Sequence, residues 1–556
     1  MRLFPVWDIR HDDEYASPLE ALLHGRGLSM DDLKVGPECL HPPAAFKDLE
    51  AGVERLAKAV RQGEKILVYG DYDVDGVTST AVMLDFLETV GASCDYMLPD
   101  RHRDGYGIKP PAVRRALERG AQVVVTVDNG ISAYEALELA RQEGLDVVVI
   151  DHHHQLGELP AAHSVINPNR LDCSYPFKGL AGVGVTFKVV QALSEVLMDG
   201  GTRRRYLNDL LDLVALGTVA DVMPVLGENR VLVQRGLQVM EQTKRPGLRH
   251  LKAVARCAEG PLSTTSLAFY LGPRINVAGR LESPDWALKL LRARSDGEAA
   301  ELAARLDSLN GKRQKMQRDG IEEAESLIAP EDLESDRAIV LLGEGWHLGI
   351  VGLIAGKICE KYHRPTVACS DGGSGGLYVG SARSIPGYNI SEGIASCAEH
   401  LVSYGGHAAA AGFSLKGDSF EAFRAGLIDH ANAGISADDL KPSLQLDLKL
   451  RPEDVCAETL EGLAVLEPCG EGNRAPLFAV DGCKVVAVRR IGKDSSHLKI
   501  NLQVGQRDCA ALWWGRGEAA EQIHPGQTLS AAFALELDTY AGNGAVQMVL
   551  KDLAAA

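Results

Sequence analysis

The stretch Gly70-Asp71-Tyr72-Asp73-Val74-Asp75-Gly76 decides the fold of the chain. An apolar run, residues 65–69, leads into it, and an amphipathic run that begins at Val77 follows it. This order predicts a buried strand, a loop and a helix. In an open parallel sheet such a loop lies at the carboxyl edge of the strands, where ligands bind. Three carboxylates crowded at that edge would repel one another without cations, so the loop predicts a metal site.

Two further β-branched runs end in polar residues that we expect at the same edge. One run ends in Asp128, the other ends in Asp151-His152-His153-His154, and Asp221 is a further candidate. Carboxylates with one or two imidazoles suit Mg²⁺ or Mn²⁺, and no cysteine lies in these stretches. Because Asp128 follows a different strand from Asp73 and Asp75, we expect it to bridge two ions. Two-metal hydrolysis is the leading hypothesis.

These motifs resemble successive motifs of the DHH phosphoesterase superfamily. The likeness is carried in chain order by residues 71–76, 127–131 and 151–154. Two later stretches, Arg274–Arg280 and Gly405–Gly412, narrow the resemblance to the RecJ family of bacterial 5′→3′ single-strand-specific DNA exonucleases. The resemblance extends from about Leu67 to the C-terminus, and five motifs in this order are highly specific.

The resemblance implies a catalytic site with two divalent ions, Mn²⁺ or Mg²⁺. One ion would be held by Asp71, Asp73 and Asp128, and the other by Asp75, Asp128, His152 and Asp221. A water activated between the ions would attack the scissile phosphate in line, without a covalent intermediate. His153 would donate to a nonbridging oxygen. The implied substrate contacts are Arg101, Arg274, Arg280, Ser381, Arg383 and His407.

The residues alone leave several alternatives open. A single Asp after a strand usually caps a helix, and a buried His is usually a satisfied core residue. Without the resemblance, a structural role would also be favoured for His407. The glycine-bearing stretch Lys178–Gly184 opens an amphipathic helix, and its N-terminus predicts either an anion cradle or an ordinary helix start. The several strand-end clusters together favour the functional interpretation.

The 556 residues exceed a single hydrophobic core and predict an α/β multidomain chain. Alternating strands and helices predict a mostly parallel DHH-type sheet, and a long bridging helix and a second α/β unit follow it. Five short strands near the C-terminus predict a closed β-barrel, which is an OB-fold in RecJ. The expected divisions are an N-terminal lead-in packed on the first domain (1–60), the catalytic domain (61–244), a helical connector (245–335), the second α/β domain (336–440) and the barrel (441–556).

The composition bounds the compartment and the partners. The net charge of −18 argues against indiscriminate binding of polyanions, so any DNA strand must follow a local basic lining. Eleven scattered cysteines without a CxxC pair predict neither disulfides nor zinc, which fits a reducing cytoplasm. The first residues lack the order of a signal peptide, and no apolar run approaches about 18 residues. We therefore expect a cytoplasmic protein without a membrane anchor.

The barrel is expected to bind single-stranded DNA by stacking bases on aromatic side chains within a basic groove. Trp513 and Trp514 are adjacent in one strand, so at most one can stack while the other packs inward. The resemblance also implies DNA repair and recombination, with single-strand-binding protein and a RecQ-type helicase as partners. Two rivals stay open: a small-substrate DHH phosphoesterase that cleaves oligonucleotides or cyclic dinucleotides, and a noncatalytic replication scaffold that could drop its ligands.

Overall fold

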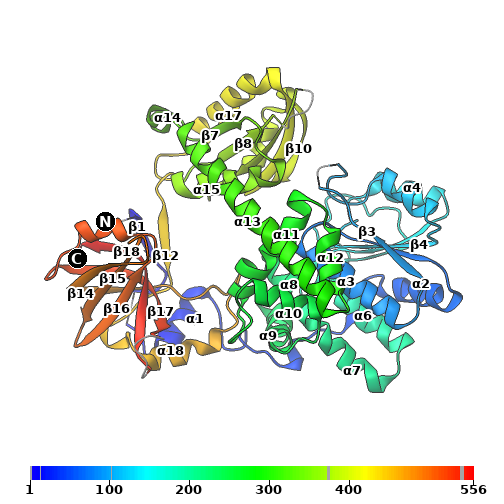
Figure 1. Cartoon of the computed structure of the whole chain (residues 1–556), viewed down its shortest axis with the longest axis horizontal. Coiled ribbons are helices and arrows are strands. Elements are labelled where there is room, and N and C mark those ends of the chain that lie inside the picture. Colours follow the sequence, from blue (N-terminus) through cyan, green and yellow to red (C-terminus); the bar gives the residue numbers. More distant parts are fainter. Residues whose placement is uncertain (1–2, 13, 102, 372–375, 539–543, 556) are drawn as a thin grey trace.

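The computed structural model describes residues 3–12, 14–101, 103–371, 376–538 and 544–555. They form a parallel sheet, a mixed sheet and a β-barrel, and Figure 1 shows these three parts set apart from one another. The long helix α13 runs from the helices beside the parallel sheet to the mixed sheet (Figure 1). Within these described ranges no helix has both the length and the apolarity that crossing a membrane requires.

The first sheet is parallel throughout and has the order β3-β2-β4-β5-β6. Its strands are β2 (Ile66–Tyr69), β3 (Cys94–Met97), β4 (Val123–Val127), β5 (Asp146–Ile150) and β6 (Ser164–Ile166). One face packs on α2 (Leu49–Gln62), α3 (Val74–Thr89) and α6 (Gly182–Leu197), and the other packs on α4 (Pro110–Glu118) and α5 (Tyr134–Gln142). Because both faces are covered, the central strands β2 and β4 are fully buried runs without polar alternation. All their carboxyl ends meet at one edge.

Helices continue from this sheet to the second one. They are α7 (Gly200–Asp209), α8 (Leu211–Ala220), α9 (Gly227–Glu241), α10 (Pro246–Val254), the π-helix η3 (Ser266–Leu271), α11 (Gly272–Leu281), α12 (Asp285–Arg292), α13 (Asp296–Ser326) and α14 (Pro330–Ser335). The expected long helix is confirmed as α13, with 31 residues. Its first half packs into the core of the parallel sheet through Leu302 and Leu306, whereas Ala324 packs against α15 (Leu348–Tyr362). One rigid helix therefore joins two hydrophobic cores.

The second sheet is mixed and has the order β10-β11-β9-β8-β7. Its strands are β7 (Ile339–Gly343), β8 (Thr366–Ser370), β9 (Leu377–Arg383), β10 (Leu401–His407) and β11 (Ala410–Lys416), with helices α16 (Ile390–Ala395) and α17 (Phe420–Gly434). Its helix α15 contacts α11, and a Cβ placed on Gly349 would lie 2.3 Å from the carbonyl oxygen of Arg280. This close approach brings the second sheet beside the first domain.

The C-terminal barrel has the five strands β14 (Phe478–Ile491), β15 (His497–Val504), β16 (Arg507–Trp513), β17 (Thr528–Leu537) and β18 (Val546–Ala555). Pairing of β14 with both β15 and β17 closes it, as the sequence predicts. The short strand β13 (Leu448–Lys449) and helix α18 (Ala457–Leu463) precede it. Single turns of 3-10 helix lie at Pro37–Cys39 (η1), Pro43–Ala45 (η2), Ala398–His400 (η4), Gly417–Ser419 (η5), Pro452–Asp454 (η6), Ala464–Leu466 (η7) and Gly517–Glu521 (η8).

The N-terminal lead-in departs from the expectation that it packs on the first domain. The part from η1 to α2 does so, because η1 contacts α9 and Phe46 lies in the core of the parallel sheet, whereas α1 (Pro18–Arg26) and Leu33 lie in the hydrophobic core of the barrel. Strand β1 (Val6–Ile9) pairs in parallel with β12 (Ser443–Leu446), some 430 residues later. Figure 1 shows α1, in blue, beside the red and orange barrel. The two ends of the chain thus build one unit, which we name the barrel module (residues 3–33 and 447–555, where described).

Candidate metal centre

The loop after β2 carries three carboxylates into one turn. Asp73 is the N-cap of α3, and its side chain accepts a hydrogen bond from the amide of Gly76 at 3.0 Å. A Cβ on Gly76 would lie 2.6 Å from the Cα of Asp71, so only glycine allows the turn to close. Asp71 and Asp75 are buried, whereas Asp73 is half-buried.

Asp75 is bound by the N-terminus of another helix. Its two carboxylate oxygens accept hydrogen bonds from the amides of Gly182 at 2.6 Å and Val183 at 2.8 Å, at the start of α6. The helix start that the sequence marked as a possible anion cradle therefore holds a carboxylate of this chain. A Cβ on Gly182 would lie 2.7 Å from an oxygen of Asp128, so this glycine lets α6 approach two acids at once.

Asp128 follows β4 with a backbone strain that points to a functional position. Its φ is 61°, in the left-handed region that side-chain-bearing residues seldom adopt. Its amide donates to the carbonyl oxygen of Ile150 at 2.9 Å, which fixes it against β5. The side chain is 3% exposed and reaches the centre of the carboxylate cluster.

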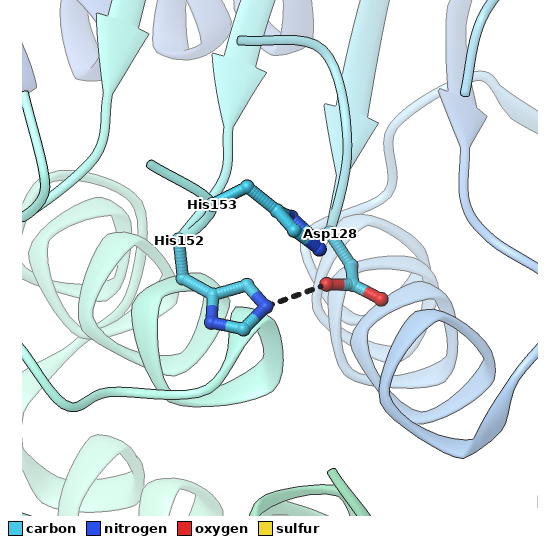
Figure 2. Close-up of side chains that lie close together, drawn as sticks. All are labelled: Asp128, His152 and His153. Carbon is cyan, nitrogen blue, oxygen red and sulfur yellow. Dashed lines mark ion pairs between the residues drawn. The ribbon is translucent and has the colours of Figure 1, made fainter. Parts of the chain in front are cut away.

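The sequence-predicted ligands converge at this edge of the sheet. Three overlapping sets of ligand atoms each lie within 4.8 Å of one another: the first is Asp71, Asp73 and Asp128, the second is Asp75, His152 and Asp221, and the third is Asp128, His152 and His153. The Nε2 atom of His152 lies 3.2 Å from Asp128 Oδ1, 3.6 Å from Asp221 Oδ2 and 3.8 Å from Asp75 Oδ2. Figure 2 shows His152 and Asp128 facing each other, with His153 beside them.

The cluster fits divalent cations. Asp71 Oδ1, Asp128 Oδ1 and His152 Nε2 are buried and make no hydrogen bond with any residue that the structure describes. Burial and the neighbouring carboxylates raise the pKa of Asp71 and of Asp128 well above the ordinary value, that of Asp75 to about 7 and that of Asp221 to about 9. Burial and the charge of His153 lower the pKa of His152 to about 4, so its ring is neutral and free to act as a ligand. Unpartnered acceptors that disfavour their own charge need a bound cation.

His153 is held beside the cluster as a cation. Burial opposes its charge, but its Nδ1 lies 2.8 Å from Asp151 Oδ1, and this contact raises the pKa of His153 to about 9. Asp151 is itself fixed by the amides of Ile131 at 2.9 Å and His152 at 2.7 Å. The hydroxyl of Tyr106 lies 3.0 Å from His153 Nδ1. The sequence missed Tyr106, although its place between Gly105 and Gly107 in a basic loop was a usable signal.

Arginines gather beside the Asp73 end of the cluster. Burial and the charges of Arg101, Arg313 and Arg383 lower the pKa of Arg280 to about 10, so these four guanidinium groups repel one another. The guanidinium of Arg101 lies 4.1 Å from the ring centroid of Tyr72, and Arg383 donates to the Ser381 hydroxyl at 3.1 Å. This arginine cluster attracts an anion. Sequence reasoning missed Arg313, because nothing in the long helix distinguishes it from an ordinary solvated arginine.

The remaining two predicted contacts lie elsewhere. Arg274 forms an ion pair with Asp307 of α13 at 2.8 Å and donates to the carbonyl oxygen of Tyr270 at 2.7 Å, so its guanidinium is engaged within the protein. His407, at the end of β10, lines a cavity of about 860 Å³ together with Tyr106, His152 and His153. The cavity therefore reaches the metal-ligand cluster at His152, and the second sheet contributes His407 to its wall.

The approach of α6 to two acids yields a prediction about metal affinity. Gly182→Ala places a Cβ against Asp128 and should weaken Mn²⁺ binding by at least about tenfold. This is the lower limit of the affinity loss that follows when a residue supporting a metal ligand is changed. Gly184→Ala is the matched control, because its Cβ would meet only the flexible side chain of Leu180 at 3.2 Å. Calorimetric titration of both variants with Mn²⁺ measures the effect. Equal affinities would contradict the role given to Gly182.

Three family models match successive parts of the chain: the DHH family N-terminal domain over residues 65–218, the DHHA1 domain over residues 335–433 and the RecJ OB domain over residues 446–552. Two relatives named single-stranded-DNA-specific exonuclease RecJ are each 36% identical. The relative from Bacillus subtilis is matched over 99% of this chain and 70% of its own length, and the one from Escherichia coli over 96% and 95%.

Solved structures agree with these matches. The crystal structure of RecJ from Thermus thermophilus in complex with Mn²⁺ superposes with a TM-score of 0.82 at 30% identity, over 99% of this chain and 80% of that one. The same protein in complex with Mg²⁺ gives a TM-score of 0.76 at 29% identity, over 99% and 78%. Because three family models match it in succession and two RecJ relatives are 36% identical to it over nearly its whole length, the chain belongs to the RecJ family.

Proposed function

We propose that the protein is a single-stranded-DNA-specific 5′→3′ exonuclease that hydrolyses phosphodiester bonds with two divalent metal ions, Mn²⁺ or Mg²⁺, in DNA repair and recombination. The observation that carries the proposal is the group of metal-ligand sets beside the arginine cluster. The metal-ligand sets suit phosphodiester hydrolysis, and the arginine cluster suits binding of a terminal phosphate. Membership in the RecJ family supports the same activity.

The proposed metal ligands are the residues of the first and second sets, with Asp128 shared by both ions. Asp71, Asp73 and Asp128 would hold one ion, and Asp75, Asp128, His152 and Asp221 would hold the other. Bound ions would supply an activated water and neutralise charge on the scissile phosphate. The chain contributes the framework: the amides of Gly182 and Val183 fix Asp75, and the strained turn at Asp128 places one carboxylate beside both sets.

His153 would stabilise the charge that develops on a nonbridging phosphate oxygen. Asp151 keeps its ring protonated, and the hydroxyl of Tyr106, 3.0 Å from the same Nδ1 atom, restricts its rotation. A cationic donor held in place before the reaction costs no reorganisation during it. The proposal gives Asp151 and Tyr106 the role of orienting His153.

The arginine cluster would hold the terminal 5′-phosphate and so set polarity. Arg383 and Ser381 come from β9 of the second sheet, whereas Arg101 follows β3 of the first domain and Arg280 lies on α11, so the pocket forms where the second sheet meets these elements. A phosphate anchored there by charge-assisted hydrogen bonds would place the next phosphodiester over the metals. His407 would contact the strand from the other side of the cavity.

The barrel would grip the strand beyond the catalytic site. Trp514 is 54% exposed with its ring 5.0 Å from that of His497, whereas Trp513 is buried in the barrel core. Trp514 is therefore the one of the pair that can stack on a base. Such a grip on a long strand favours a polymer substrate over the small-substrate alternative, and the retained ligand sets speak against a noncatalytic scaffold. A single-strand-binding protein and a RecQ-type helicase in the cytoplasm are the partners that this role would need.

Digestion of end-labelled substrates tests the proposed function. The wild type with Mn²⁺ or Mg²⁺ should release mononucleotides from the 5′ end of single-stranded DNA and leave duplex DNA intact. Asp128→Asn should lower exonuclease activity by more than about a hundredfold, because it removes the carboxylate that both ions would share. Loss of a residue that only supports a metal ligand costs up to about a hundredfold. Asparagine tolerates the left-handed backbone at this position, so circular dichroism should show an unchanged fold. Turnover close to wild type would contradict the two-metal assignment.

The proposed 5′-phosphate pocket predicts a change in end preference. Arg383→Ala should lower kcat/KM on 5′-phosphorylated strands by about tenfold more than on 5′-hydroxyl strands, because the lost bonds are charge-assisted. Arg274→Ala is the control, since its ion pair with Asp307 keeps it engaged elsewhere, and its ratio should stay at the wild-type value. An unchanged ratio in Arg383→Ala would remove Arg383 from the pocket.

A further inference from the structure

Arg230 of α9 is a buried cation whose donors all serve the barrel module. It is 1% exposed, and its five N–H groups bind five backbone carbonyl oxygens. Nε donates to Leu33 at 3.2 Å, Nη1 to Leu466 at 3.0 Å and Pro468 at 3.1 Å, and Nη2 to Val465 at 2.8 Å and Glu467 at 2.7 Å. A guanidinium has five donors, so none is left unused.

The carbonyl acceptors explain how a charge can be buried here. Four of them follow one another from Val465, within η7 (Ala464–Leu466), to Pro468, where the end of a helical turn leaves carbonyl oxygens without acceptor bonds inside the turn and with partial negative charge. Burying a cation away from water is costly, and this ring of dipoles offsets that cost only while the geometry is kept. Arg230 therefore stabilises one placement of residues 465–468 on α9 and disfavours others.

The loop that contains these acceptors, residues 465–473, is held on both sides; we name it the joint loop. Asn473 is fully buried, and its amide donates to the carbonyl oxygens of Leu466 at 2.7 Å and Pro468 at 3.1 Å, which stiffens the loop internally. From the catalytic body, the amide of Val225 donates to Glu471 at 2.7 Å, and the Thr264 hydroxyl donates to Cys469. The joint loop is thus clamped to α9 and its neighbours.

The same residue also reaches the N-terminal part of the barrel module. Leu33 lies in the barrel core together with Leu463 and Leu466, although more than 400 residues separate them. In Figure 1, α9 lies between the barrel module and the parallel sheet. Domains joined by linkers move relative to one another unless a specific interface holds them. Arg230 provides such an interface, because it donates hydrogen bonds to the N-terminal segment of the barrel module at Leu33 and to the C-terminal segment at residues 465–468.

We propose that Arg230 is a positioning residue that holds the barrel module in line with the metal centre, so that a strand gripped by the barrel is delivered to the metals. The inference rests on the proposed exonuclease function. Two binding elements on one strand reinforce each other only when their geometry allows both to engage at once. Without the clamp, the barrel would still bind DNA and the metal centre would still cleave it, but the two events would be uncoupled.

The test compares substrate lengths in the full chain. In Arg230→Met, which keeps the volume but not the donors, kcat/KM on a 5′-phosphorylated trinucleotide should stay within about twofold of wild type. The number of nucleotides removed per binding event on a long single strand should fall at least about tenfold. Arg230→Lys retains the charge and some donors, so its number of nucleotides removed per binding event should lie between those of wild type and Arg230→Met. Arg235→Ala, on the same helix with only surface partners, should match wild type on both substrates.

Equal losses of activity on the two substrates in both Arg230 variants would overturn the proposal, because they would indicate a role in folding. Unchanged processivity on the long strand would also overturn it. If wild type itself cleaves neither substrate, the proposed function fails while the clamp is still tested by small-angle scattering. Arg230→Met should then give a larger radius of gyration than wild type and Arg235→Ala, and an identical scattering curve would overturn the clamp.

Discussion

Repulsion among buried carboxylates at one sheet edge is the constraint on which the rest of the structure depends. Asp71, Asp75 and Asp128 lie together with little access to water, and burial alone would drive them to the neutral form. The fold counters this with helix N-termini: Asp73 is the N-cap of α3, and α6 donates two amide hydrogen bonds to Asp75. Glycines let these helix ends approach closely, and cations complete the balance.

A cluster of positive charge lies beside this cluster of carboxylates. A chain with a net charge of −18 still gathers Arg101, Arg280, Arg313 and Arg383 beside its acidic cluster, drawing them from the first domain, the long helix and the second sheet. A phosphate strand that lies between the two clusters would be oriented with its anionic end toward the arginines. Since the second sheet reaches the first domain where α15 meets α11, the orientation depends on contacts between domains as much as on the metal ligands.

Local patterns predicted the features that are built locally. The strand, loop and helix around Asp71–Asp75, the long helix α13 and the five barrel strands follow from periodicity and turn residues, and the motifs marked the ligands that the structure brings together. Features that depend on distant partners escaped prediction. The pairing of β1 with β12 moves the first strand to the barrel, the ion pair with Asp307 engages Arg274, and Arg230 resembles any arginine on an amphipathic helix until its five carbonyls are seen.

The central claim is that one carboxylate, Asp128, lies between two ions at this sheet edge. Electron paramagnetic resonance of the Mn²⁺-loaded protein tests it most directly, combined with a count of bound ions. The account predicts two ions per chain whose spins are coupled, because ions that share a carboxylate lie about 3.5–4 Å apart. A single bound ion, or two ions with the uncoupled six-line spectrum of isolated Mn²⁺, would contradict it.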